Sequence, residues 1–332
     1  MKKILNDVYS YVDEMLVGLC AAHPEYYAQT AEGARVIKRS DAPIKGKVGL
    51  VTGGGSGHLP VFTGYVGQGL LDAAAIGDVF ASPSADQMVE AMRAADGGAG
   101  ILCIYGNYGG DVMNFSMARD LIEMEDIRTT AVVLADDVAS AKAAEAEKRR
   151  GVAGLIYAYK VAGAAADAGE NLDEVTRLAR KAADSVRSIG AALTSCTVPQ
   201  AGKPTFQIGE TEMEMGMGIH GEPGVWRGPM RTADKIAAEM MDTLLADQRL
   251  AAGDRASVLI NSLGATPPEE LYILYRYVKR RLDDLGVKIV MPLVGRYATS
   301  MEMAGVSFTF CKLDEELERY LKAPAECAFW KV

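Results

Sequence analysis

Val48-Gly-Leu-Val-Thr52-Gly-Gly-Gly-Ser-Gly-His58-Leu-Pro60 places a short apolar run directly before a cluster of glycines. A short run of apolar and β-branched residues is typical of a buried strand, and glycines commonly end such a run in a tight loop. A structured segment resumes at Leu59. The pattern predicts a strand, a tight loop and a helix, with His58 at the end of the loop.

The same order recurs along the first half of the chain. The second unit has a strand at Gly100 to Tyr105, a loop at Gly106 to Gly110 and a helix at Asp111 to Met124. The third has a strand at Thr129 to Leu134, an Asp136-Asp137 turn and a helix through Ala141 to Lys148. Apolar strands alternating with amphipathic helices predict a mostly parallel sheet covered on both faces. Ligands in such sheets bind beyond the carboxyl ends of the strands, where His58 and Asp111 both fall.

Helical spacing predicts an opening helix from Ile4 to Ala21 and a long alanine-rich helical region from Ile156 to Ser188. The pattern then changes to extended pieces at Ala191 to Val198 and Thr205 to Ile208, helices at Arg231 to Leu245 and Pro268 to Leu285, and strands at Ser257 to Asn261, Val287 to Leu293 and Val306 to Phe310. The sequence therefore predicts two α/β domains, 1–185 and 186–332, each with a mainly parallel or mixed sheet flanked by helices.

The composition is that of a globular protein, with 49% hydrophobic and 24% charged residues among 332. The net charge of −9 argues against binding nucleic acid, which needs a basic face. No signal sequence or membrane-spanning stretch is visible, so we expect a cytoplasmic protein without a membrane partner. The five cysteines are scattered and lack Cys-x-x-Cys spacing, which predicts reduced thiols and no metal site.

Two of the three histidines lie in glycine-rich turns, His58 in the stretch quoted first and His220 in Gly218-Ile-His220-Gly-Glu-Pro-Gly224. Glycine lets a ligand approach the main chain closely, so an imidazole framed by glycines is placed to meet a small molecule. Either histidine taken alone is equally well explained as a hydrogen-bonded structural residue. His23 follows a helical run and precedes a proline, which predicts a helix-end position without a catalytic role.

The glycine loop fits neither common nucleotide-binding pattern. A P-loop needs Gly-x-x-x-x-Gly-Lys-Ser/Thr, and the dinucleotide fingerprint needs Gly-x-Gly-x-x-Gly at the start of a helix. Gly53-Gly-Gly-Ser-Gly57-His-Leu-Pro satisfies neither. Binding of ATP by these routes is therefore not expected, and a plain strand-to-helix turn remains an alternative for the loop.

His58, Asp111 and His220 together supply two bases and a nucleophile. An imidazole can add to a reactive carbonyl, and a carboxylate within reach of a hydroxyl can take its proton. A small ketone that carries a hydroxyl would suit this set. Asp111 alone is weaker evidence, because aspartate in the first turn of a helix is also an ordinary cap.

The chain resembles the substrate-binding K subunit family of dihydroxyacetone kinases from its opening helix to its last strand. The residues that carry the resemblance are Gly53-Gly-Gly-Ser-Gly-His58, Asn107-Tyr-Gly-Gly-Asp111-Val-Met-Asn-Phe115, Cys196-Thr-Val-Pro, Gly216-Met-Gly-Ile-His-Gly-Glu-Pro-Gly224 and Asn261-Ser-Leu-Gly-Ala-Thr-Pro267. The Gly-Ile-His-Gly-Glu-Pro-Gly block is highly specific. The resemblance implies a two-domain α/β subunit, usually a homodimer.

The resemblance also implies how the residues act. His220 matches the histidine that holds dihydroxyacetone as a covalent hemiaminal, His58 its partner in the glycine loop, and Asp111 the family's base. Gly55, Ser56, Gly57 and Gly106 match positions that line the substrate. Trapping a carbonyl carbon selects short ketoses over glycerol, which has none.

In this family, nucleotide binding belongs to a separate all-helical L subunit or to a fused domain. The resemblance therefore implies no cofactor on this chain, with ADP or ATP and magnesium on a partner L subunit. Because the chain ends at Val332, it resembles the split form. The phosphoryl donor is then either a phosphocarrier of the phosphotransferase system or ATP, and the sequence does not choose between them.

Two positions depart from the better-known members, which have Glu where this chain has Leu59 and a substrate-contacting Lys where it has Gly106. Loss of a charged donor and gain of space change which hydroxyls a pocket recognises. We therefore expect that a larger ketose, such as four-carbon erythrulose, is accepted as well as or instead of dihydroxyacetone.

Two rival functions use the same carbonyl trap. A non-catalytic ketose sensor that acts as a transcriptional coactivator would keep His220, but it would not need the proton acceptors His58 and Asp111. An aldolase or isomerase is disfavoured because no Schiff-base lysine accompanies the motifs.

Overall fold

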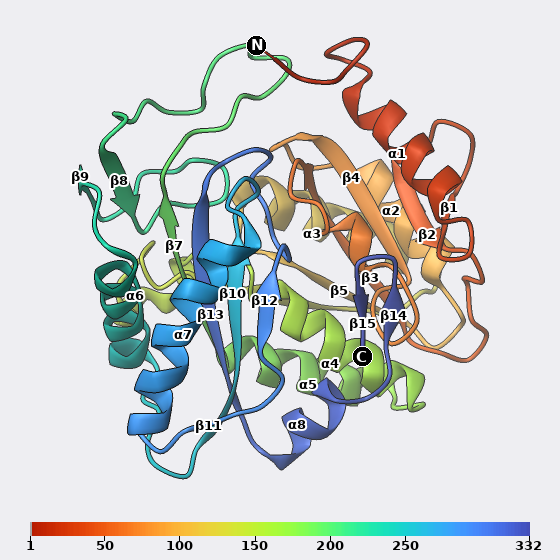
Figure 1. The fold of residues 1–332 in the computed structure, drawn as a ribbon. Helices are drawn as coiled ribbons and strands as arrows, with labels where there is room; N and C mark the ends of the chain where they lie inside the picture. The colour runs from red at the N-terminus through yellow and green to blue at the C-terminus, as the bar shows by residue number, and fades with distance from the viewer. Residues whose placement is uncertain (1) are drawn as a thin grey trace.

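Two β-sheets, one from each half of the chain, organise residues 2–332 of the computed structural model (Figure 1). The first sheet has the order β1-β2-β4-β3-β5-β6, and its strands are β1 (Tyr27–Gln29), β2 (Val36–Arg39), β3 (Gly49–Ser56), β4 (Ala73–Val79), β5 (Ile101–Gly106) and β6 (Thr129–Leu134). The last four pair in parallel, while β1 and β2 add an antiparallel edge. The predicted, mostly parallel sheet is therefore present.

Helices cover both faces of this sheet. One face packs against α2 (Ala85–Ala95) and α3 (Gly109–Glu123), and the other against α4 (Leu155–Asp167) and α5 (Leu172–Asp184). Neighbouring residues of β3 point to opposite faces, so Val51 lies in the core under α2 and α3 while Leu50 lies in the core under α4. Burial on both faces explains why these strands are continuous apolar runs.

The second sheet is mixed, with the order β11-β10-β13-β7-β8-β9 and with β12 also beside β10. Its strands are β7 (Val186–Ala192), β8 (Glu212–Met215), β9 (Trp226–Pro229), β10 (Arg255–Ser262), β11 (Lys288–Ile289), β12 (Leu293–Gly295) and β13 (Gly305–Leu313). Helices α6 (Ala233–Asp247) and α7 (Pro268–Asp284) pack on it, and their side chains share one core with the strands. The predicted fold class is confirmed.

The strand β3 differs from its prediction, because it continues through the glycines to Ser56 instead of ending at Thr52. Gly53 and Gly54 pair with Ala75 and Ile76 of β4. A side chain at Gly54 would lie 2.1 Å from the ring of Phe62. The glycines therefore make room for packing against the strand rather than ending it.

The prediction of a helix directly after the glycine loop was wrong. Only a 3-10 turn, η1 (Thr63–Tyr65), follows, because Pro60 and repeated glycines interrupt helical hydrogen bonding there. The helix predicted through Ala141 to Lys148 is also a 3-10 segment, η2 (Ala143–Lys148).

Three further predictions needed correction. The opening helix, α1, spans Tyr11–Ala22 and not Ile4 to Ala21. The long region from Ile156 to Ser188 divides into α4 and α5 at Gly169, whose φ of 82° is unfavourable for a residue with a side chain. Thr205 to Ile208 forms no strand.

The end of the chain returns to the first half. After α8 (Glu315–Leu321), the strands β14 (Glu326–Cys327) and β15 (Trp330–Lys331) form a hairpin. The Glu326 amide donates to the Gln68 carbonyl at 2.9 Å, and the Trp330 ring packs edge-on against Tyr65. The first sheet ends before residue 185 and the second begins after it. Because the hairpin near the end of the chain packs against the first half, the division into two domains stays a prediction.

No helix among residues 2–332 is long and apolar enough to cross a membrane. All five cysteines are free thiols, and four of them are buried.

Candidate active site

The structure brings two of the three predicted catalytic side chains, His58 and His220, into contact, and Asp111 lies near enough for the charge of His220 to act on it. His58 follows the carboxyl end of β3, and Asp111 lies in the first turn of α3, directly after β5. His220 comes from the loop between β8 and β9 of the second sheet. The His58 and His220 rings lie edge to face with centroids 4.8 Å apart, and the charge of His220 acts on Asp111.

His58 is neutral and fully buried. Its Nδ1 lies 2.7 Å from the Thr299 carbonyl oxygen, which can only accept, so Nδ1 carries the proton. Burial, and then the neighbouring His220, lower the pKa of His58 to about 3. The Nε2 lone pair is therefore free at neutral pH.

His220 is held by the acidic residue two positions after it. Its Nδ1 lies 3.0 Å from one carboxylate oxygen of Glu222, and its backbone amide nitrogen lies 3.0 Å from the other. Burial alone would raise the pKa of Glu222, but the hydrogen bond and the charge of His220 hold this pKa at about 2. An ionised carboxylate has no proton to give, so His220 Nδ1 donates to Glu222.

Asp111 is buried, and it does not act as the helix cap. The N-cap of α3 is Tyr108, with no side-chain capping bond. Burial raises the pKa of Asp111 to about 6, against the opposing effects of the Ser82 side chain and His220. A carboxylate with this pKa is ionised at neutral pH and close to the value that suits a general base.

Aromatic rings enclose the histidine pair. Phe80 stacks on His58 with centroids 4.8 Å apart, and Tyr108 lies edge-on to His220 at 4.7 Å. Phe80 has a φ of 59°, a strained conformation for a bulky side chain of the kind found at functional sites. Burial raises the pKa of Tyr108 far above its usual range, so its hydroxyl keeps its proton.

Three buried polar atoms at this place have no hydrogen-bond partner. Within residues 2–332 only five side-chain atoms are in this state, and His58 Nε2, Tyr108 Oη and Asp111 Oδ1 are three of them. Buried polar groups are normally paired, because an unpaired one costs about 1–3 kcal/mol. Each of these atoms is available to a polar ligand.

The glycines predicted to line the substrate keep the loop closely packed. Side chains at Gly55 and Gly57 would lie 2.8 Å from atoms of Phe80, and Gly57 has a φ of 101°. Ser56 and Gly57, together with Leu59 and Thr299, also line a cavity of about 420 Å³. None of His58, Asp111 and His220 lines this cavity. Gly106 is the last residue of β5, and a Cβ added to it would lie 3.2 Å from the Tyr108 ring.

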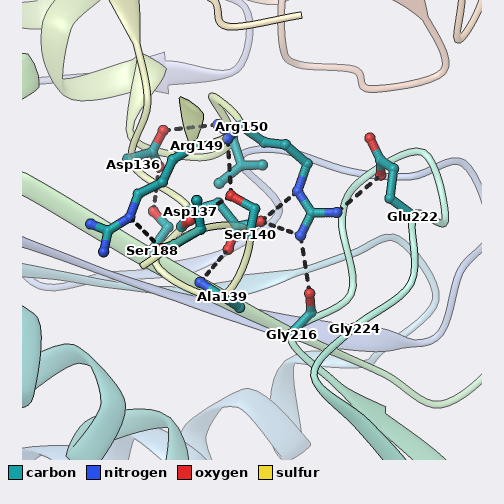
Figure 2. A network of polar contacts seen from close by, with 12 residues as sticks. Asp136, Asp137, Ala139, Ser140, Arg149, Arg150, Ser188, Gly216, Glu222 and Gly224 are labelled. Atoms are coloured by element: carbon teal, nitrogen blue, oxygen red, sulfur yellow. Dashed lines mark hydrogen bonds and ion pairs between the residues drawn. The ribbon is translucent and has the colours of Figure 1, made fainter. Parts of the chain in front are cut away.

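Sequence reasoning missed Phe80, Glu222 and Arg150. Arg150 donates from Nε to Asp137 at 2.9 Å and from Nη2 to the Gly216 carbonyl at 3.1 Å, and its Nη1 lies 3.9 Å from Glu222 (Figure 2). The spacing His-Gly-Glu could have indicated Glu222 as a partner of His220. Nothing in the sequence around Phe80 distinguishes it from a core residue.

No group of three or more His, Cys, Asp or Glu side chains in the part of the chain that the structure describes could hold a metal ion.

The buried, neutral His58 makes stability depend on pH. The folded protein keeps His58 neutral to about pH 3, whereas the unfolded chain protonates it near pH 6.5. The free energy of unfolding should therefore fall as the pH drops below 6.5. Between pH ~7.5 and ~5 the wild type should lose about 2 kcal/mol more than His58→Asn in urea titrations. Equal losses would show that His58 is already protonated in the fold.

Comparisons with known proteins identify the family to which the chain belongs. The Dak1 domain family matches residues 17–329. The chain is 46% identical, over 99% of its length and 100% of the relative's, to the dihydroxyacetone-binding subunit of PTS-dependent dihydroxyacetone kinase 1 from Listeria innocua. It is 44% identical to a D-erythrulose kinase from Mycolicibacterium smegmatis, covering 100% of this chain and 57% of that one.

Two solved structures are also similar over nearly the whole chain. The dihydroxyacetone kinase of C. freundii superposes with a TM-score of 0.90 at 33% identity, covering 100% of this chain and 60% of that one. A dihydroxyacetone kinase operon co-activator superposes with a TM-score of 0.89 at 31% identity, covering 98% of this chain and 99% of the other.

Proposed function

Because the chain belongs to the Dak1 domain family, we propose that it is the ketose-binding subunit of a dihydroxyacetone-type kinase. It holds a short ketose as a covalent hemiaminal on His220 while a separate nucleotide-binding subunit delivers the phosphoryl group. The observation that carries this proposal is that three buried polar atoms, on His58, Tyr108 and Asp111, have no hydrogen-bond partner, while the rings of His58 and Tyr108 both lie edge to face with that of His220.

Capture of the ketose follows from the state of His220. The Nε2 electron pair forms a bond to the carbonyl carbon, and the π pair of the carbonyl moves onto its oxygen, which takes a proton from water. The ring gives up its Nδ1 proton through Glu222, 3.0 Å away, to the hydroxide that this water leaves, so that the adduct is neutral. The protonated Tyr108 hydroxyl can donate to the new oxygen, and neutral His58 can accept from a ketose hydroxyl.

Phosphoryl transfer then needs a base and positioning. Asp111 takes the proton of the terminal hydroxyl as that oxygen attacks phosphorus, and the covalent bond to His220 holds the hydroxyl in place. A relative of the same length is described as the dihydroxyacetone-binding subunit of a PTS-dependent kinase. This supports a donor on another polypeptide, an L subunit that either keeps ADP with magnesium and is rephosphorylated by a phosphocarrier of the phosphotransferase system, or exchanges ATP directly.

A crystal soaked with dihydroxyacetone tests the capture step directly. We expect continuous density between His220 Nε2 and the carbon that was the carbonyl, with tetrahedral geometry at that carbon. An intact planar ketone away from the ring would overturn the proposal.

We also propose that the active form is a cytoplasmic homodimer with two domains divided near residue 185. Strand β6 is the last strand of the first sheet, and Val133 is exposed on it, which leaves an edge that a second copy could cover.

The pocket is proposed to accept a four-carbon ketose as well as or instead of a three-carbon one. A kinase named for D-erythrulose is 44% identical to this chain, which supports the expectation drawn from Leu59 and Gly106. We expect Gly106→Lys to shift kcat/KM towards dihydroxyacetone by about tenfold, because the added side chain fills space and restores a donor. Steady-state rates with both sugars and a cognate L subunit measure this. A strong preference of the wild type for the three-carbon sugar would reject it.

The alternative, a ketose sensor that acts as a transcriptional coactivator, is favoured by one observation, the close superposition on an operon co-activator. The retained base Asp111, with its pKa of about 6, favours the kinase. Turnover with an L subunit separates the two functions.

A further inference from the structure

Arg150 joins the loop after β6 to the loop that carries His220 (Figure 2). Its guanidinium contacts three groups: Asp137 through Nε at 2.9 Å and Nη2 at 2.7 Å, the Gly216 carbonyl through Nη2 at 3.1 Å, and Glu222 through Nη1 at 3.9 Å. The side chain is only 14% exposed, so solvent screens these contacts weakly.

The loop that presents Arg150 is closed on itself and fixed to the second sheet. The Asp137 amide donates to the Arg150 carbonyl at 3.1 Å, and the Arg150 amide donates to Ser140 Oγ at 3.0 Å. The Val138 amide donates to the Ser188 carbonyl of β7 at 2.9 Å. Arg150 therefore projects from a rigid base, as a side chain that orients another group must.

The histidine loop leaves space for this contact. Gly216 takes a φ of 82° and turns its carbonyl to Arg150. A side chain at Gly218 would lie 2.2 Å from Glu222 Oε2 and 2.6 Å from Arg150 Nη1. Glycine at position 218 therefore lets Arg150 and Glu222 approach each other.

Glu222 in turn fixes the ring of His220. One of its oxygens accepts from the His220 amide and the other from Nδ1, so the direction of the carboxylate sets the direction of the ring. Without a cation beside it, the carboxylate would be free to rotate towards water, and the proton could move to Nε2, the atom that must carry the lone pair.

We propose that Arg150 is a positioning residue for His220, which it orients through Glu222 so that the Nδ1–H tautomer faces the carboxylate and Nε2 faces the ketose. This inference rests on the proposed role of His220 as the nucleophile. Arg150 itself touches no ketose.

The neighbouring arginine provides a matched control. Arg149 is also buried and also pairs with an aspartate, Asp247, through Nη1 at 3.0 Å, and it contacts none of Gly216, His220 and Glu222. Arg149→Gln should lower the thermal midpoint but leave ketose affinity unchanged. Arg150→Gln should weaken ketose binding about ten- to hundredfold, since the cation that lies 3.9 Å from Glu222 is lost.

Histidine ring ¹⁵N spectra of the ketose-free protein give a readout that a merely structural role would not move. Only three histidines contribute signals, and His23→Ala and His58→Asn assign two of them. The wild type and Arg149→Gln should show His220 as the Nδ1–H tautomer, and Arg150→Gln should show a mixture. Arg150→Lys should fall between them, because lysine keeps the charge but not the planar fork.

A double-mutant cycle tests the route through Glu222. On a Glu222→Gln background, Arg150→Gln should weaken ketose binding no further. Additive effects, equal losses in Arg149→Gln and Arg150→Gln, or an unchanged His220 tautomer in Arg150→Gln would each overturn the inference. If Arg150→Gln fails to fold, Arg150→Lys is judged by the same spectra. The proposed function fails separately, if wild type and His220→Ala bind ketose equally well.

Discussion

His220→Ala is expected to abolish covalent retention of ketose and to lower turnover on the order of a thousandfold or more, because the variant lacks the atom that bonds to the carbonyl carbon. The readout is the ¹³C spectrum of a ketose labelled at its carbonyl carbon. In the wild type the signal should move from the ketone to the tetrahedral region, and in His220→Ala it should stay at the ketone position.

The third histidine is the control for this experiment. His23 is the C-cap of α1 and packs beside Tyr27, away from the histidine pair. His23→Ala should form the adduct like the wild type. A tetrahedral carbon that persists in His220→Ala would place the nucleophile elsewhere and end the proposed mechanism.

Asp111→Asn is expected to retain the adduct but to lower turnover by about 10²–10⁴-fold, since an amide cannot take the hydroxyl proton. In the wild type, turnover should rise with pH through about 6, where Asp111 ionises. The pH–rate profile with saturating ketose and a cognate L subunit measures both effects. Turnover in Asp111→Asn close to the wild-type value would remove Asp111 from the mechanism.

The same substitution should stabilise the fold at neutral pH. The pKa of Asp111 is about 6 in the folded protein against 3.8 in the unfolded chain, so the folded protein holds this proton more tightly. Stability is therefore lost as pH rises from 3.8 through about 6. Asp111→Asn should be about 1–3 kcal/mol more stable than the wild type at pH ~7.5 and similar to it near pH ~4.

The sequence could place His58 and Asp111 at one edge of a sheet, because both follow apolar runs that pair in parallel as β3 and β5. The approach of His220 was not predictable from pattern. Its loop joins β8 to β9 in the other sheet, and its link to His58 came from the shared glycine-rich setting and from the resemblance to a known family. Contacts between elements far apart in sequence leave no periodic signal within either element.

The glycine stretch shows a second limit. Glycines after an apolar run commonly end a strand, yet here β3 continues through its glycines and stays paired with β4. Phe62 and Phe80 pack where side chains at these positions would otherwise lie. The sequence shows that side chains are missing at Gly53, Gly54, Gly55 and Gly57, but it does not show what fills the space. Phe80, the ring that stacks on His58, was missed for the same reason.

The hairpin β14–β15 determines how chimeras between relatives should be cut. Since Trp330 and Glu326 contact Tyr65 and Gln68, the last residues of one parent would meet a foreign surface in a simple exchange at residue 185. A hybrid that transplants the glycine-loop half of a relative named as an erythrulose kinase should carry residues 323–332 from the same donor, so that these contacts stay between sequences that evolved together.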